Sequence, residues 1–175
     1  LDIGKDGLVL NRQNGESFSD EQIEEHLQTP DDNILYHVVA ALHKGISIEK
    51  IYQLSAIDPW FLKKINNIVE VERRLKSSAL DHNLLSDAKK FGFSDNQIGR
   101  AVKKEGLEVR KIRKDLGVIP VVKQIDTLAA EWPAETNYLY LTYGGTANDI
   151  SITKKDSGVI VLGAGPYRIG SSVEF

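Results

Sequence analysis

The stretch GISIEKIYQLSAIDPWFLKKINNIVEVERRLK, residues 45–76, decides the fold because it contains the clearest helix signal of the chain. The Asp58 carboxylate can accept hydrogen bonds from the first amides of a helix, and the fixed φ of Pro59 suits the first helical position. One apolar stripe at helical spacing follows: Phe61, Ile65, Ile68, Val69 and Leu75. The pattern predicts a helix near 59–76 whose stripe packs against other helices.

Part of this stretch recurs later in the chain. GISIEKIYQLSAIDPWFLKKI from Gly45 aligns with GFSDNQIGRAVKKEGLEVRKI from Gly92. The apolar positions coincide at a constant offset: Ile51 with Ile98, Trp60 with Leu107, Leu62 with Val109 and Ile65 with Ile112. The pairing predicts a duplicated helical hairpin. It favours a core position for Trp60, with an interface anchor, shared with Trp132, as the alternative.

Capping signals extend the helical region from about residue 19 to 117. Ser19 with Gln22, and Ser94 with Gln97, have capping-box spacing, and Gly45, Gly92 and Gly117 follow periodic runs where a left-handed residue can end a helix. The predicted helices lie near 20–28, 31–44, 47–54, 59–76, 83–91, 95–104 and 106–116.

The pattern changes to strands after Gly117. VIPVVKQI and NYLYLTY are rich in β-branched and aromatic residues, and VIVL at 159–162 predicts a buried strand leading into a glycine loop with Gly163, Gly165 and Gly170. A dinucleotide fingerprint needs a glycine at position 168, which is arginine. A structural strand-to-helix turn is therefore favoured over a phosphate-binding loop.

Composition limits the classes of function. The 175 residues are 41% hydrophobic and 27% charged, which fits one ordinary globular domain or a small domain with an appendage. A formal charge of -3 gives no general attraction to nucleic acid or anionic membranes, and no apolar run reaches the length of a membrane span. The absence of cysteine excludes disulfides and thiolate sites and favours a reducing cytosol.

Two helices joined near Gly106 could form a helix-turn-helix, because basic residues gather there: Arg100, Lys103, Lys104, Arg110, Lys111, Arg113 and Lys114. The favoured interpretation is a solvated helix face, since Val109, Ile112 and Leu116 take the core side and three acidic residues dilute the charge.

The histidines and carboxylates give no clear site. No two of the four histidines lie at i,i+4, so we expect surface or partly buried histidines and no metal site. Asp126 and Glu131 could flank a pocket, although polar contacts within a loop are the favoured interpretation. We therefore predict no catalytic, cofactor-binding or metal-binding residue in this segment.

Four stretches together resemble the large subunit of carbamoyl-phosphate synthetase across essentially the whole chain. They are IDPWFLKKI (57–65), the run from GFSD (92–95) to the helix at 106–116, PVVKQIDTLAAEWPAETNYLYLTY (120–143) and VIVLGAGPYRIGSSVEF (159–175). In that family two homologous ATP-grasp halves are separated by a helical oligomerisation domain, and an allosteric domain follows them. The resemblance implies that the chain spans the junction entering the second half.

The fold expected from the resemblance is mainly α. Residues 1–18 would be the tail of the preceding synthetic module, and 19–117 a helical oligomerisation domain of about seven helices. Residues 118–157 would be a linker with short strands. A truncated α/β extension, residues 158–175, would hold the first strand and glycine loop of a pre-ATP-grasp domain.

The resemblance also implies a function for the parent protein, a ligase. That enzyme makes carbamoyl phosphate from bicarbonate, ammonia or glutamine, and two ATP with magnesium, for arginine and pyrimidine synthesis. The segment itself is expected to be non-catalytic and cytoplasmic, with no nucleic-acid or membrane partner. Its expected partners are a second copy, other domains of the same chain and a glutaminase. Ser172 would line a carbamate tunnel or, alternatively, cap or pack the first helix of the module.

Overall fold

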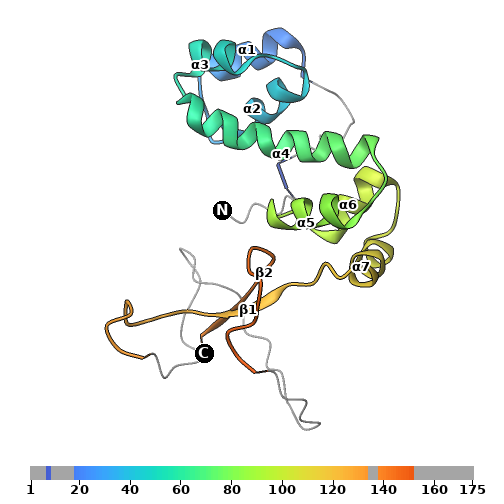
Figure 1. Cartoon of the computed structure of the whole chain (residues 1–175). Coiled ribbons are helices and arrows are strands. Elements are labelled where there is room, and N and C mark those ends of the chain that lie inside the picture. The colour runs from blue at the N-terminus through green and yellow to red at the C-terminus, as the bar shows by residue number, and fades with distance from the viewer. Residues whose placement is uncertain (1–6, 9–17, 134–137, 152–175) are drawn as a thin grey trace, which may run out of the picture.

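The computed structural model describes residues 7–8, 18–133 and 138–151, and the fold is given for these residues. Helices precede a small antiparallel sheet, as Figure 1 shows. The elements are α1 (Asp20–Gln28), α2 (Ile34–His43), α3 (Ile48–Ser55), α4 (Pro59–Ser77), α5 (His82–Lys90), α6 (Asp95–Val102), α7 (Gly106–Asp115), β1 (Val121–Gln124) and β2 (Leu139–Thr142). The expectation of a mainly helical fold with about seven helices is confirmed for the described part of the chain.

The predicted caps explain where these helices begin and end. Ser19 and Ser94 form complete capping boxes, and the Asp58 carboxylate accepts a hydrogen bond from the amide of Trp60 at 2.7 Å. Gly45 and Gly92 follow α2 and α5 with φ of +82° and +89°, a conformation that favours glycine. Local signals of this kind act within a few residues, which is why the sequence located the helices closely.

Helix α4 joins two hydrophobic cores. Leu62 and Val69 of this helix belong to a core with α1, α2 and α3, while Val71 and Leu75, nearer its end, belong to a core with α5, α6 and α7. In Figure 1, α1 to α3 lie on one side of α4, and α5 and α6 lie on the other. The helical region therefore consists of two units that share one long helix.

The structure supports the predicted duplicated hairpin, and the bonds that end the helix before each hairpin also match. The amide bonds that end α2, from Gly45 to Leu42 O and from Ile46 to Ala41 O, have counterparts after α5 from Gly92 to Lys89 O and from Phe93 to Ala88 O. Ile51 and Ile98, the paired residues of α3 and α6, are both fully buried, as are Leu62 and Val109 of α4 and α7. The hairpins α3–α4 and α6–α7 are thus two copies of one unit, and each follows a helix that ends in the same pair of amide bonds.

Two predictions about the apolar stripe of α4 are wrong. Trp60, expected in the core, and Phe61, expected on the stripe, are 59% and 56% exposed. Leu62 is the first buried residue of the helix, and Leu62 and Val69 belong to one core. Trp60 and Phe61 precede these buried residues in the first turn of the helix.

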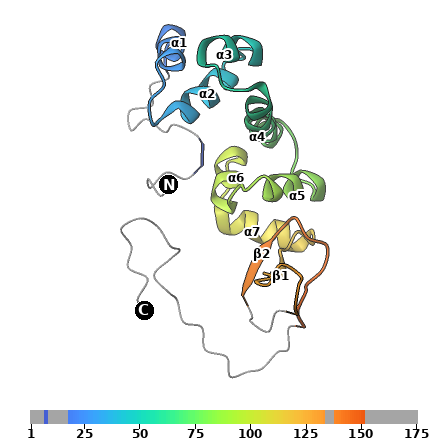
Figure 2. The same ribbon diagram turned by 90° about the vertical axis from the view of Figure 1, so that its left-hand side faces the viewer.

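Strands β1 and β2 pair antiparallel, with Val121 opposite Thr142 and Gln124 opposite Leu139. The loop that follows β2 covers the other edge of β1. There the Val122 amide donates to Asn148 Oδ1 at 2.8 Å, and the Asp149 amide donates to the Val122 carbonyl at 2.9 Å. The two predicted strands are confirmed, and Figure 2 shows the hairpin beside α7. The predicted strand at 159–162, the glycine loop and Ser172 lie outside the described residues.

Candidate assembly and interdomain surfaces

An aromatic pair marks the start of α4. The rings of Trp60 and Phe61 meet edge to face with centroids 4.9 Å apart, and the Lys64 ammonium lies 5.2 Å from the Trp60 ring centroid. Large exposed aromatic side chains with a nearby cation are typical of the residues that anchor protein interfaces. The interface alternative for Trp60 therefore fits the structure, whereas the core position does not.

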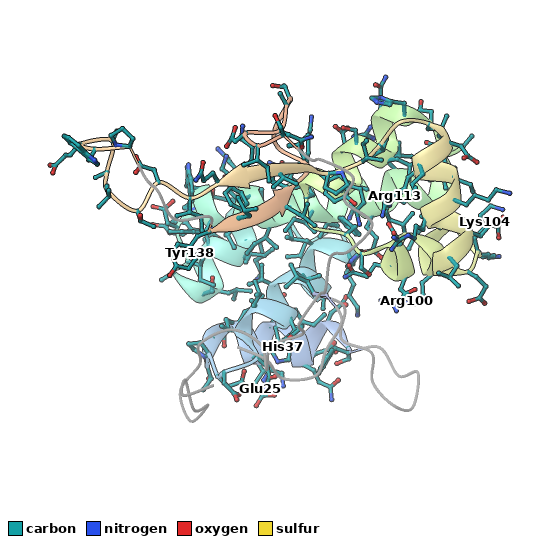
Figure 3. All side chains as sticks on the ribbon, turned by 90° about the horizontal axis from the view of Figure 1, so that it is seen from below. Glu25, His37, Arg100, Lys104, Arg113 and Tyr138 are labelled. Atoms are coloured by element: carbon teal, nitrogen blue, oxygen red, sulfur yellow. The ribbon has the colours of Figure 1, made fainter. Side chains whose placement is uncertain are left out.

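The hairpin presents a second apolar surface. Its strands and flanking loops expose large hydrophobic side chains: Ile119, Ile125, Leu128, Trp132, Tyr138, Leu139, Tyr140 and Leu141. Figure 3 places Tyr138 at the far end of the hairpin from Arg113 and the α6–α7 pair. A two-stranded sheet is marginal alone, so this surface is suited to packing against another domain. Asp126 accepts hydrogen bonds from the amides of Leu128 and Ala130, which supports its expected loop role.

A buried charge cluster fixes the hairpin to the second helical unit. The Arg113 Nε donates to both Asp95 carboxylate oxygens at 2.9 and 3.0 Å, and the Lys89 ammonium lies 3.2 Å from Asp95 Oδ1. The Tyr143 ring, directly after β2, lies 5.1 Å from the Lys89 ammonium and 5.6 Å from the Arg113 guanidinium. These contacts join α5, α6, α7 and the end of β2.

The electrostatics of Asp95 follow from this arrangement. Partial burial raises the pKa of Asp95, but the hydrogen bonds from Arg113 and Lys89 outweigh it, so the pKa lies below its ordinary value. Burial raises the pKa of Tyr143. The carboxylate of Asp95 therefore remains charged and holds two cations in place.

Arg113 corrects the expectation that the basic residues of α6 and α7 form one solvated face. Its side chain is only 7% exposed and is committed to Asp95. Lys104 pairs with Glu108 across one helical turn, and Figure 3 shows Lys104 at the outer edge of α6–α7, apart from Arg113. The set of basic residues is thus divided between the interior and the surface.

A second carboxylate lies between the two helical units. Glu72 of α4 contacts His43 of α2 at 3.2 Å and Lys76 one turn further along at 2.5 Å. The hydrogen bond from His43 lowers the pKa of Glu72 to about 2. Burial opposes this shift, and Lys76 adds to it. Glu72 also lines a cavity of about 330 Å³ between the units, to which Leu8, Val69, Phe93 and Gln97 contribute. Gly7 and Leu8 therefore lie against this cavity.

Three possible metal ligands meet where α1 leads into α2. His26 lies in the last turn of α1, Asp31 in the following loop and His37 in α2, and one ligand atom of each lies within 4.8 Å of the others. His37 is 3% exposed, so the expectation of surface or partly buried histidines is wrong for this residue. The i,i+4 rule missed the group because its members come from two helices and a loop.

The buried Asp95–Arg113 pair was also missed, although the repeat contains a signal for it. The alignment pairs Asp95 with Ile48 and Arg113 with Asn66. The second copy therefore has an acidic and a basic residue at two positions where the first copy has uncharged residues. When two aligned positions become oppositely charged in one copy only, the two residues are candidates for an ion pair in that copy.

Among the described residues, no helix is long and apolar enough to cross a membrane.

Comparisons with known proteins identify the helical region. Residues 1–117 match the family described as carbamoyl-phosphate synthetase large chain, oligomerisation domain. The chain is 50% identical over 157 residues to the multifunctional protein CAD of Squalus acanthias, an alignment covering 87% of this chain and 7% of that protein. It is 45% identical over 177 residues to the arginine-specific carbamoyl phosphate synthase large chain of Eremothecium gossypii, covering 97% and 16%.

A third relative is the mitochondrial ammonia carbamoyl-phosphate synthase of Aquarana catesbeiana, 44% identical over 174 residues, with 97% of this chain and 12% of that protein covered. The chain thus spans between 7% and 16% of the length of these three relatives. From the match over residues 1–117 and these identities, the chain belongs to the family of the carbamoyl-phosphate synthetase large-chain oligomerisation domain.

Proposed function

We propose that this segment assembles copies of a carbamoyl-phosphate synthetase and spaces its two synthetic halves. The exposed Trp60–Phe61 pair is the observation that carries the assembly role, because a stable monomer gains nothing from two adjacent aromatic rings in water. The apolar hairpin supports the spacer role, since its surface is suited to the domain that would follow. Self-association and contacts with other domains of the same chain are the proposed partners.

The chemistry belongs to the proposed parent enzyme. That enzyme would be a ligase forming carbamoyl phosphate from bicarbonate, ammonia or glutamine, and two ATP with magnesium. A glutaminase subunit or domain would supply the ammonia. The relatives named arginine-specific and CAD support a role in biosynthesis without selecting one pathway for this chain. Because some relatives are named as mitochondrial, a cytoplasmic location remains a prediction.

Within this proposal, residues 1–18 end the preceding module, 19–117 form the oligomerisation domain, 118–157 link it onward and 158–175 begin the second synthetic half. Ser172 remains a candidate for the carbamate tunnel. The segment alone is proposed to be inactive and to lack tight nucleotide binding. An ATP titration by calorimetry that showed micromolar affinity would contradict this part.

Sedimentation velocity of the 175-residue chain over a wide concentration range tests assembly. We expect a concentration-dependent dimer or larger species that dissociates in the double variant Trp60→Ser, Phe61→Ser. Both side chains are more than half exposed, so their replacement leaves the core intact. Leu107→Ser is the matched control, because Leu107 occupies the equivalent position of α7 and is 82% exposed.

The control should assemble like the parent chain, since the residue after Leu107 is a charged glutamate rather than a second aromatic. A chain that is monomeric at all concentrations would contradict self-association through this segment. Equal loss of assembly in both variants would contradict the assignment to the aromatic pair.

A further inference from the structure

The group formed by His26, Asp31 and His37 has features that packing alone does not explain. In the second helical unit, Leu84 takes the position of His37, and both side chains are buried. The aligned buried position of the second unit is thus filled by an aliphatic side chain. An imidazole in its place, close to a second imidazole and a carboxylate, indicates a chemical role.

The aspartate is already oriented toward the histidines. Asp31 Oδ1 accepts a hydrogen bond from the Asn33 amide at 2.8 Å, while Oδ2 lies 3.8 Å from His26 Nδ1. One carboxylate oxygen is thus held by the backbone, and the other faces the histidine pair. The loop needs no large movement to offer this oxygen as a ligand.

The two histidine rings lie against each other. Their centroids are 4.0 Å apart and the rings are 8° from parallel, with Phe18 packed edge-on against His37 at 4.9 Å. A metal ion lies in the plane of each imidazole that binds it, so one ring must turn before both can bind the same ion. His26 can do so because it is at the end of α1 with a side chain 38% exposed, whereas His37 is buried.

The local charge favours a cation. Helix α1 carries Asp20, Glu21, Glu24 and Glu25, and Asp32 follows Asp31 in the loop. Within the described part of the chain, only Asp20 and Glu24 of these pair with a lysine, Lys44 and Lys50 respectively. The remaining negative charge raises the local concentration of divalent cations.

We propose that His26, Asp31 and His37 form a zinc-binding site that fastens α1 to α2. Two imidazoles and one carboxylate suit Zn²⁺, with water as the fourth ligand. Tetrahedral zinc requires ligand atoms roughly 3.3 Å apart, a value that follows from bond lengths of about 2.0–2.1 Å. The three ligand atoms now lie within 4.8 Å of one another, so His26 must rotate and Asp31 must shift slightly to bring them to this spacing. The site would stabilise the first helical unit by linking a helix, a loop and a second helix.

Competition between the 175-residue chain and a chromophoric zinc chelator tests the proposal. The parent chain should bind one Zn²⁺ and unfold at a higher temperature in its presence. His26→Gln and Asp31→Asn should each weaken binding by at least tenfold and abolish the thermal shift. Both side chains are substantially exposed, so these variants should fold.

The neighbouring residues supply matched controls. Asp32→Asn changes an adjacent carboxylate that accepts from the Asn33 side chain, and His82→Gln removes an exposed histidine from α5. Both controls should bind zinc like the parent chain. Absence of saturable one-to-one binding, or binding that survives in His26→Gln and Asp31→Asn, would overturn the proposal. Co²⁺ substitution gives an independent readout, because a tetrahedral site produces intense visible absorption that octahedral Co²⁺ in water lacks.

Discussion

Asp95→Asn tests whether the buried charge cluster holds the second helical unit together. The substitution keeps the shape of the side chain but leaves the Arg113 guanidinium, 7% exposed, without a counter-charge. Lys89 also loses its carboxylate and retains the Phe93 carbonyl at 2.7 Å and the Tyr143 ring, neither of which carries a negative charge. Removing one partner of a buried ion pair costs about 3–5 kcal/mol.

The cost here should fall toward or below the lower end of that range. The Asp95 side chain is partly exposed, and asparagine keeps one acceptor oxygen for Arg113. We expect the free energy of unfolding to decrease by about 2–3 kcal/mol. For a helical region of about 100 residues, this corresponds to a decrease in Tm of roughly 10–14 °C.

Urea unfolding followed by circular dichroism at 222 nm measures this change at pH 7. Glu108→Gln is the matched control, because it removes a carboxylate from the exposed pair with Lys104 and should change stability by about 0.5 kcal/mol or less. The difference between Asp95→Asn and the parent chain should shrink as pH falls below about 4, the ordinary aspartate range. The reason is that Asp95 has a lowered pKa in the folded state, so its stabilising effect is present above the unfolded pKa and is lost on protonation.

Asp95→Asn with the stability of the parent chain would refute this account of the cluster. A difference that persisted undiminished at pH 2 would show that the carboxylate charge is not its source. In that case, packing or the hydrogen bonds of α6 would have to explain the loss.

Two further predictions concern single residues. Because the pKa of Glu72 is lowered to about 2, its contribution to stability should be complete above about pH 4.5 and be lost toward pH 2. In urea titrations the parent chain should therefore lose more stability than Glu72→Gln between pH 6 and 2.5. Parallel losses of stability in the two chains would contradict this prediction. A Cβ at Gly99 would lie 2.4 Å from the Lys104 carbonyl oxygen, so Gly99→Ala should lower the free energy of unfolding by about 1–3 kcal/mol. Gly144→Ala, where the nearest atom is at 3.4 Å, should change it little, and equal effects in the two variants would contradict the steric argument.

The helices could be predicted because their determinants are local. Ser94 with Gln97 defines a helix start within four residues, and Gly92 ends the preceding helix through its own backbone conformation. The start of α2 was placed too early, at 31 instead of Ile34, because Asp31 forms a turn with the Asn33 amide rather than entering the helix. This difference is also local, because an aspartate can cap a helix start or form a turn with the amide two residues on, and the two cases have similar sequence patterns.

The candidate sites depend on contacts between distant residues, and the sequence predicted them poorly. Arg113 reaches Asp95 of α6, and His37 meets His26 across the α1–α2 turn. Helical periodicity assigns a residue to a face but does not say which element covers that face. Trp60 shows the same limit, since its place in the repeat was right while the inference that this place is buried was wrong.

The two copies of the helical hairpin have diverged in ways that suit each to a separate task. The second and third residues of α4 and of α7 are exposed in both copies. The first copy has Trp60 and Phe61 at these positions. The second copy has Leu107 and Glu108, and Glu108 pairs with Lys104. An aromatic pair favours contact with another protein, whereas the ion pair keeps its surface hydrated. Tyr143, by contrast, packs on the charge cluster and on the hydrophobic core of the second copy. The first unit is therefore suited to assembly and the second to holding the segment that leads onward, which allows one shared helix to connect the two tasks.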